Sequence, residues 1–189
     1  MPRLLALTLL MFALALPASA REVAGVTLPE TLTLHNDDTP LVLNGAGIRR
    51  KFFFRIYVGA LYLPRRVETA EAVLAQPGPK RVRMHFLYDE VPRAKLVKGW
   101  EEGFEANQDA ASLAKLHPRL ERFNALFPDV KRGDVIDLDY LPGRGTEVWI
   151  NHSLAGSIEG GDFYRALLMV WLGAQPADAD LREAMLGAD

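Results

Sequence analysis

Residues 44–63 read NGAGIRRKFFFRIYVGALYL, and this stretch decides the fold. Its first part, Gly45 to Arg49, has the glycine spacing of a turn that delivers an arginine. The part from Phe53 to Leu63 is aromatic and aliphatic, which is typical of a β-strand. Because side chains alternate between the faces of a strand, one face is predicted to pack on a core through Phe54, Ile56, Val58, Ala60 and Tyr62.

The other face of this strand has the composition of a binding cleft. It combines apolar surface with a guanidinium, a phenol and a bare glycine backbone, in Phe53, Arg55, Tyr57, Gly59 and Leu61. Small-molecule clefts are mostly apolar and carry a few placed polar groups. We therefore predict that this face lines a ligand cleft.

The same stretch resembles the chalcone-isomerase-like family, in which a Gly-x-Gly-x-Arg turn leads into a strand that ends in Tyr-Leu. Here the turn is Gly45 to Arg49 and the pair is Tyr62-Leu63. Residues 158–173, IEGGDFYRALLMVWLG, followed by Pro176 and Leu181, look like the bacterial secreted branch of that family. The resemblance covers nearly all of the chain after its first twenty-odd residues. It implies a long antiparallel sheet with helices on one side and a ligand cleft between them.

The rest of the chain is consistent with one α+β domain. Alternating apolar residues indicate strands at 26–34, 41–43, 80–90, 133–141 and 146–150, with turns at 36–40 and 142–145. Helical spacing or composition indicates helices at 68–76, 92–104, 113–127 and 163–172, and a last short helix up to Leu186. An antiparallel β-sheet covered on one face by helices, an open-faced β-sandwich, accommodates this order.

The first twenty residues have the pattern of a signal peptide. Arg3 supplies a positive charge, residues 4–16 are apolar, and residues 17–20 end in a small-x-small cleavage pattern. Cleavage after Ala20 would leave residues 21–189 as a periplasmic or secreted chalcone-isomerase-like domain of a bacterial cell. A retained N-terminal anchor is the alternative. No later apolar stretch reaches the roughly 20 residues that a membrane span needs.

Composition excludes several classes of function. The net charge of −2 gives no reason to expect nucleic acid as a partner, and the absence of cysteine excludes disulfides and thiolate chemistry. No metal site or cofactor is predicted, because no pair of histidines has ligand spacing. Haem would need one histidine, and nothing identifies which one. We interpret Asp134, Asp137 and Asp139 as a solvated strand edge.

The resemblance implies that Arg49 and Tyr57 hold a ligand carboxylate, as an arginine and a tyrosine do in plant fatty-acid-binding members. On a straight strand the two would lie about 26 Å apart, and so they meet only if the chain turns or bulges near Arg50 and Lys51. The alternatives are a surface arginine and a tyrosine packed within the sheet. Arg55 is predicted either as a second anion contact or as the partner of a glutamate among residues 101–105.

The ligand tail is predicted to lie between the strand and the covering helices. The strand would contribute Phe53, Gly59 and Leu61, and the helices would contribute Trp100, Phe104 and Trp171. This arrangement suits a small amphipathic acid or an aromatic ligand.

Three functions remain open from the sequence. The first is non-catalytic binding of a small amphipathic carboxylate such as a fatty acid. The second is an intramolecular lyase or isomerase acting on a chalcone-like enone, with Arg49 as its one catalytic candidate. Chalcone isomerase also relies on a tyrosine at the start of a helix, and the matching residues 91–98 contain none. The third is a ligand-free envelope protein that binds a protein partner.

Overall fold

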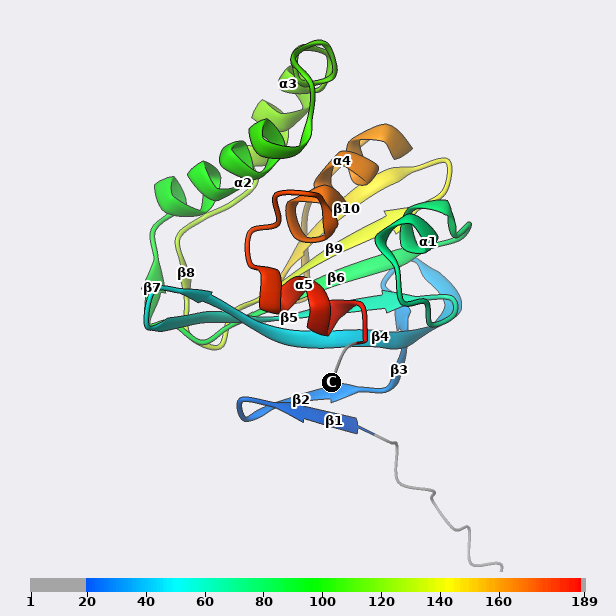
Figure 1. Cartoon of the computed structure of the whole chain (residues 1–189), viewed down its shortest axis with the longest axis vertical. Coiled ribbons are helices and arrows are strands. Elements are labelled where there is room, and N and C mark those ends of the chain that lie inside the picture. The colour runs from blue at the N-terminus through cyan, green and yellow to red at the C-terminus, as the bar shows by residue number, and fades with distance from the viewer. Residues whose placement is uncertain (1–19, 188–189) are drawn as a thin grey trace, which may run out of the picture.

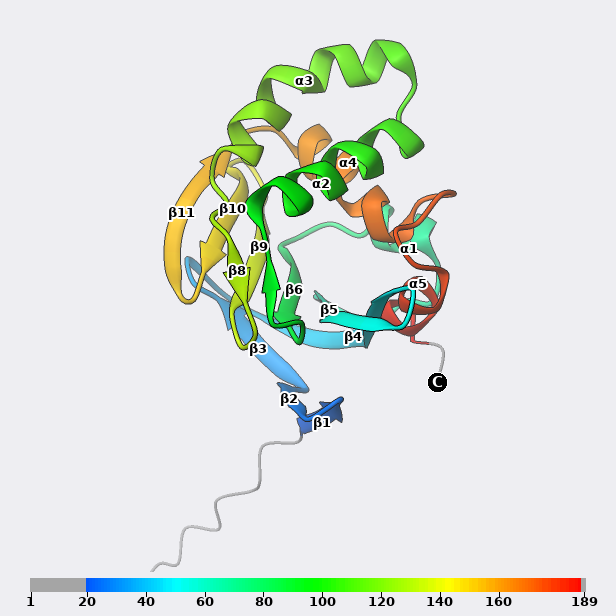
Figure 2. The same cartoon turned by 90° about the vertical axis from the view of Figure 1, so that its left-hand side faces the viewer.

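Seven antiparallel strands form the main sheet of the computed structural model, which describes residues 20–187. The sheet has the order β11-β10-β9-β6-β5-β4-β3 and is curled (Figures 1 and 2). Its strands are β3 (Thr31–Leu34), β4 (Asp37–Lys51), β5 (Phe54–Leu63), β6 (Lys80–Phe86), β9 (Val135–Leu141), β10 (Gly145–Ile150) and β11 (Ser153–Ile158). Two short pairs accompany it: β1 (Ala20–Val23) with β2 (Val26–Pro29), and β7 (Glu90–Val91) with β8 (Val130–Lys131).

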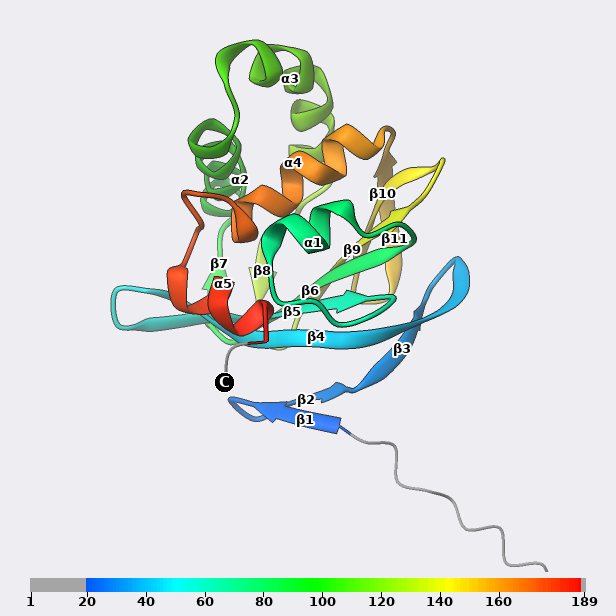
Figure 3. The ribbon, with the colours of Figure 1, turned by 45° about the vertical axis from the view of Figure 1, so that its right-hand side comes forward.

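The helices lie over one face of this sheet, which confirms the predicted fold class (Figures 1 and 3). They are α1 (Ala70–Ala75), α2 (Arg93–Asn107), α3 (Ala110–Asn124), α4 (Gly161–Leu172) and α5 (Ala179–Met185). In the part of the chain that the structure describes, no helix has the length and apolarity to cross a membrane. The predicted signal peptide, apart from Ala20, lies outside the described residues.

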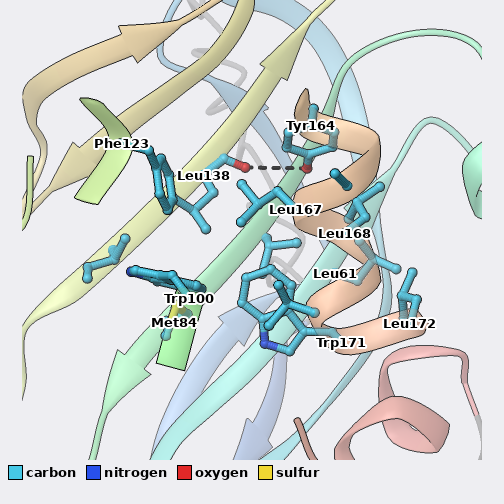
Figure 4. Close-up of a cluster of buried hydrophobic side chains, with 14 of the residues drawn as sticks. Leu61, Met84, Trp100, Phe123, Leu138, Tyr164, Leu167, Leu168, Trp171 and Leu172 are labelled. Atoms are coloured by element: carbon cyan, nitrogen blue, oxygen red, sulfur yellow. Dashed lines mark hydrogen bonds between the residues drawn. The ribbon is translucent and has the colours of Figure 1, made fainter. Parts of the chain in front are cut away.

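The sheet buries apolar side chains on both faces. On the helix side, α4 is apolar nearly all round and lies in the centre of the larger core, where Leu61 of β5 is fully buried (Figure 4). The hydroxyl of Tyr164 on α4 donates to the carbonyl of Leu138, 3.4 Å away. On the opposite face, β1 and β2 cover a smaller core that includes Val58 and Tyr62. The two faces of β5 therefore separate over residues 57–63 as the alternation predicts.

The prediction of a turn at Gly45 to Arg49 is wrong, because these residues lie inside the long strand β4. Their glycines instead allow α5 to approach the strand closely. A Cβ at Gly45 would collide with the carbonyl oxygen of Ala184, and one at Gly47 would lie 2.6 Å from the Cβ of Ala184. The motif therefore seats α5 directly on the strand. The turn predicted at 36–40 is also displaced, since β4 already begins at Asp37.

The chain turns at Phe52 and Phe53, and a bulge follows in β5. Arg49 pairs with Tyr57, whereas Arg50 pairs with Arg55, so Ile56 is the extra residue on β5. Its carbonyl accepts hydrogen bonds from the amides of residues 87 and 88. Because a bulge shifts the alternation by one, Ile56 lies with Tyr57 on the helix side, where the sequence pattern does not predict it.

The prediction of a solvated acidic edge is wrong for Asp137 and Asp139. Both carboxylates are buried and lie opposite arginines on the neighbouring strand β6. Arg81 holds Asp139 through two hydrogen bonds of 2.6 and 2.7 Å, and Arg83 holds Asp137 through two of 2.7 Å. Burial is tolerated because each charge has a bidentate partner.

Candidate ligand-binding cleft

A cleft of about 780 Å³ lies on the helix side, between the β4–β5 hairpin, β6 and α2. Its apolar walls come from neighbouring strands and from α2, through Ile56, Met84, Phe86, Leu96 and Trp100. Residues 175–177, in the loop between α4 and α5, complete the lining. This volume falls within the range of about 300–1,000 Å³ that is common for small-molecule sites.

The hairpin brings Arg49 and Tyr57 side by side at this cleft. They are directly paired across β4 and β5, and both line the cleft. The reversal that joins them occurs at residues 52–53, just beyond the Arg50-Lys51 position that the sequence suggests. Residues directly opposite on an antiparallel pair lie on the same face with their Cβ atoms about 5 Å apart.

The guanidinium of Arg49 is only partly used by the protein. Its Nη1 contacts a carboxylate oxygen of Asp178 at 3.5 Å and the carbonyl of Arg50. Within residues 20–187, its Nε and Nη2 have no hydrogen-bond partner. The side chain is 21% exposed, so it is oriented and still accessible. A guanidinium with free N–H groups in a fixed plane is suited to bidentate binding of a carboxylate.

Asp178 links this arginine to α5. One of its oxygens caps the helix by accepting from the amide of Leu181 at 3.0 Å, and the other accepts from the backbone amide of Arg50 at 2.8 Å. The helix that the glycines seat therefore also fixes the end of β4. The sequence predicts a last short helix in this region, but nothing local in it indicates that Asp178 contacts Arg49.

Tyr57 is buried, and its hydroxyl accepts a hydrogen bond of 3.0 Å from the indole Nε1 of Trp171. Burial raises the pKa of this phenol, although the Trp171 hydrogen bond and the charge of Arg49 partly oppose the rise. The hydroxyl is therefore neutral at physiological pH. Among the described residues its own proton has no acceptor, and so it is available to an anionic oxygen in the cleft.

Trp171 has a different position from the predicted one. The sequence analysis places it along the ligand tail, whereas the structure places it behind Tyr57 as a hydrogen-bond donor. Its ring contacts that of Trp100 edge to face, with centroids 5.6 Å apart. Trp100 does line the cleft, as the resemblance suggests.

Five of the predicted ligand residues lie outside the cleft lining. Gly59 lies under Leu181 of α5, and Leu61 is buried in the core beside α4. Phe104 is fully buried against Phe163. Phe53 and Arg55 are exposed near the hairpin turn, and no ion pair joins Arg55 to residues 101–105 of the described chain. The bulge moves Arg55 off the face of Tyr57, α5 covers Gly59, and α4 takes the place next to Leu61 and Phe104.

A profile of chalcone isomerase-like proteins matches residues 20–187, which is most of the chain. The chain belongs to the chalcone isomerase-like family. No sequence among curated proteins matches it. A crystal structure of an Arabidopsis thaliana fatty-acid binding protein is similar to this chalcone isomerase-like protein, with a TM-score of 0.63 and 18% sequence identity. The similarity covers 86% of this chain and 92% of that one, and at this identity it shows a shared fold.

A second tyrosine, which is not among the predicted ligand residues, also lines the cleft of this chalcone isomerase-like protein. Tyr88 follows β6, and its ring contacts Phe54 edge to face with centroids 5.3 Å apart. It lies before α2 and not at its start, where residues 91–98 contain no phenol. Among the described residues, no group of three histidine, aspartate or glutamate side chains is arranged to hold a metal ion.

Proposed function

We propose that this chalcone isomerase-like protein binds a small amphipathic carboxylate, most simply a fatty acid, without transforming it. The ligand carboxylate lies between Arg49 and Tyr57, and its tail runs along the apolar wall of Met84, Phe86 and Trp100. The observation that carries this proposal is the pairing of an incompletely used guanidinium with a phenol whose proton has no acceptor within residues 20–187. The name of the similar Arabidopsis thaliana protein, a fatty-acid binding protein, supports the same ligand class.

The location of the protein is part of the proposal. The signal-peptide pattern of residues 1–20 supports export to the periplasm of a bacterial cell. In that compartment a cleft of this kind keeps a poorly soluble acid in solution, since the apolar tail is removed from water while the carboxylate stays paired.

The test is native mass spectrometry of the exported protein, followed by organic extraction of anything bound. We expect a co-purifying fatty or aromatic acid. Arg49→Gln and Tyr57→Phe should each weaken its binding by about 10- to 150-fold, the loss of one charge-assisted hydrogen-bonding partner. Arg55→Gln is the matched control, because it removes a nearby exposed arginine outside the cleft lining.

Two results would overturn this proposal. If the protein is recovered without ligand and gains no mass when free fatty acids are added, a ligand-free partner protein becomes the better account. If naringenin chalcone loses its colour faster than the spontaneous rate in the presence of the protein, the isomerase alternative holds. Tyr88→Phe would then show whether the phenol of the cleft wall takes part.

A further inference from the structure

The tip of the β4–β5 hairpin carries the most exposed aromatic side chains of the described chain. Phe52, Phe53 and Phe54 are 85%, 98% and 53% exposed, and the only other exposed large hydrophobic residue in this part of the chain is Leu154 on β11. We call these three residues the aromatic tip. The hairpin projects from the fold at the left of Figure 3. A contiguous exposed apolar patch of this kind usually marks an interaction site.

Cations border the aromatic tip on both strands. Arg50 and Lys51 precede it and Arg55 follows it, and residues 49–55 contain no carboxylate. In the described chain none of these three side chains forms an ion pair, whereas Arg49 is paired with Asp178. The net charge of −2 for the whole chain therefore conceals a local excess of positive charge in residues 49–55.

The backbone of the tip adds an independent observation. Phe52 has a φ of 55°, a left-handed conformation that is unfavourable for a bulky side chain. The β1–β2 turn places Ala24 and Gly25 at positive φ, the β9–β10 turn uses Gly143 and Gly145, and the β10–β11 turn uses Asn151 and His152. Among the described residues, Phe52 is the one phenylalanine, tyrosine or tryptophan at such a position. An aromatic side chain that is exposed to solvent and held in an unfavourable backbone conformation indicates a contact outside the chain.

The aromatic tip also adjoins the cleft. Phe52 and Phe54 belong to the cleft lining, and Lys51 lies beside them at its mouth. Phe53 and Arg50 are not part of that lining, and both side chains are exposed to solvent. The surface that is exposed at the tip is thus continuous with the entrance of the cleft.

From these observations we infer that the hairpin docks on the surface of a lipid bilayer that contains anionic phospholipids. Aromatic side chains enter the boundary between head groups and acyl chains, and arginine and lysine remain at the phosphates, which is the arrangement that this tip presents. Three exposed aromatic side chains at a projecting turn, flanked by three cations without ion pairs in the described chain, favour a bilayer surface over a protein partner as the occupant. If the proposed function is also correct, docking places the cleft entrance against the membrane from which an amphipathic acid leaves or to which it returns.

Vesicle flotation tests the docking. The exported protein is used, and its mass establishes that every variant has the same N-terminus. We expect binding to vesicles of phosphatidylcholine with phosphatidylglycerol, weaker binding to phosphatidylcholine alone, and loss of the difference at high salt. Phe53→Ser should weaken binding to the mixed vesicles by about tenfold, since an aromatic side chain that enters the bilayer boundary on docking is lost. Arg50→Gln should weaken it by about fivefold, and only on the anionic vesicles.

Leu154→Ser is the matched control, because it removes an exposed apolar residue from another edge of the sheet. Phe52→Gly serves as a second tip variant, since glycine suits the positive φ and keeps the hairpin folded. Equal binding of wild type, Phe53→Ser and Phe52→Gly would overturn the inference. So would a failure of the wild type to distinguish anionic from neutral vesicles, or cross-linking of the tip to an envelope protein without any vesicle binding.

These variants test the membrane docking and the ligand site independently of each other. Phe53→Ser should leave fatty-acid binding in solution unchanged, because Phe53 is outside the cleft lining. Tyr57→Phe should leave vesicle binding unchanged, because its side chain is buried. Loss of vesicle binding in Tyr57→Phe at intact folding would show instead that the bound ligand, and not the aromatic tip, drives the membrane contact.

Discussion

The two faces of the main sheet hold arginine in opposite ways. On the face away from the helices, which we call the saturated face, Arg81 bonds bidentately to Asp139 and lies 3.6 Å from Asp137, so each of its three guanidinium nitrogens is next to a protein carboxylate. On the helix face, Arg49 lines the cleft, has one carboxylate at 3.5 Å, and keeps an Nε and an Nη2 without a partner in the described chain. The first arrangement therefore uses the guanidinium for stability, and the second leaves donors for the ligand carboxylate of the proposed function.

Removing a carboxylate from the saturated face should have the largest effect. Asp139→Ala leaves Arg81 charged, buried and short of its main partner, which should lower the free energy of unfolding by about 3–5 kcal/mol. Denaturant unfolding measures this change. The double variant Arg81→Met with Asp139→Leu should recover most of the loss, because it removes both charges together. A single variant as stable as the wild type would mean that the two faces do not differ as described.

The matching change on the helix face, at Arg49, should weaken ligand binding and change the free energy of unfolding very little. Arg49→Gln should weaken binding of a fatty acid by about 1.5–3 kcal/mol, since a charge-assisted pair is lost. Its free energy of unfolding should change by less than about 1 kcal/mol, because the contact with Asp178 is long and partly solvated. Calorimetric titration and denaturant unfolding on the same sample separate the two quantities. A stability loss as large as that of Asp139→Ala would remove the contrast.

The glycines of β4 show why local sequence could not reveal how the cleft face is built. The spacing of Gly45 and Gly47 indicates a turn when only neighbours in sequence are considered, but the requirement comes from Ala184, some 140 residues away. Strand β5, the hairpin of β9 and β10 and the helix α4 were predictable because their patterns are local. The bulge at Ile56 has no comparable local signature, and it shifts the parity of the residues near the turn.

The candidate site was also predictable only in part, because some of its contacts join segments that are far apart in the sequence. Arg49, Tyr57 and Trp100 were indicated by resemblance and line the cleft, whereas the roles of Trp171 and Asp178 depend on α4 and α5 returning to the hairpin. The buried ion pairs did leave a signal. Arginines at 81 and 83 and aspartates at 137 and 139 share the two-residue spacing of one strand face, and cross-strand pairing follows from it.

Adding a methyl group where α5 packs on β4 should have an intermediate effect on stability. Gly45→Ala would place its Cβ against the backbone of Ala184, so α5 must shift, at a cost of about 1–3 kcal/mol in the free energy of unfolding. Because Asp178 starts α5 and contacts Arg49, ligand binding should weaken as well. Gly99→Ala is the control for the stability measurement, because its added Cβ meets nothing within 4 Å and its φ is not positive. Unchanged binding in a destabilised Gly45→Ala would show that α5 does not help to position Arg49.

The smallest effect should be a difference in acid sensitivity between wild type and Asp137→Asn. Burial raises the pKa of Asp137, but hydrogen bonds from Arg83 and the charge of Arg81 outweigh it and hold that pKa below its ordinary value of 3.8. The ionised form is therefore favoured in the folded state, and its stabilisation is complete above the unfolded-state pKa and is lost as pH falls below it. Urea unfolding between neutral and strongly acidic pH should show a steeper decline below pH 3.8 for the wild type than for Asp137→Asn. Glu102→Gln, which alters an exposed carboxylate of α2, should follow the wild type. If Asp137→Asn declines in parallel with both, Asp137 contributes no such acid sensitivity, and its carboxyl group would titrate alike in the folded and unfolded states.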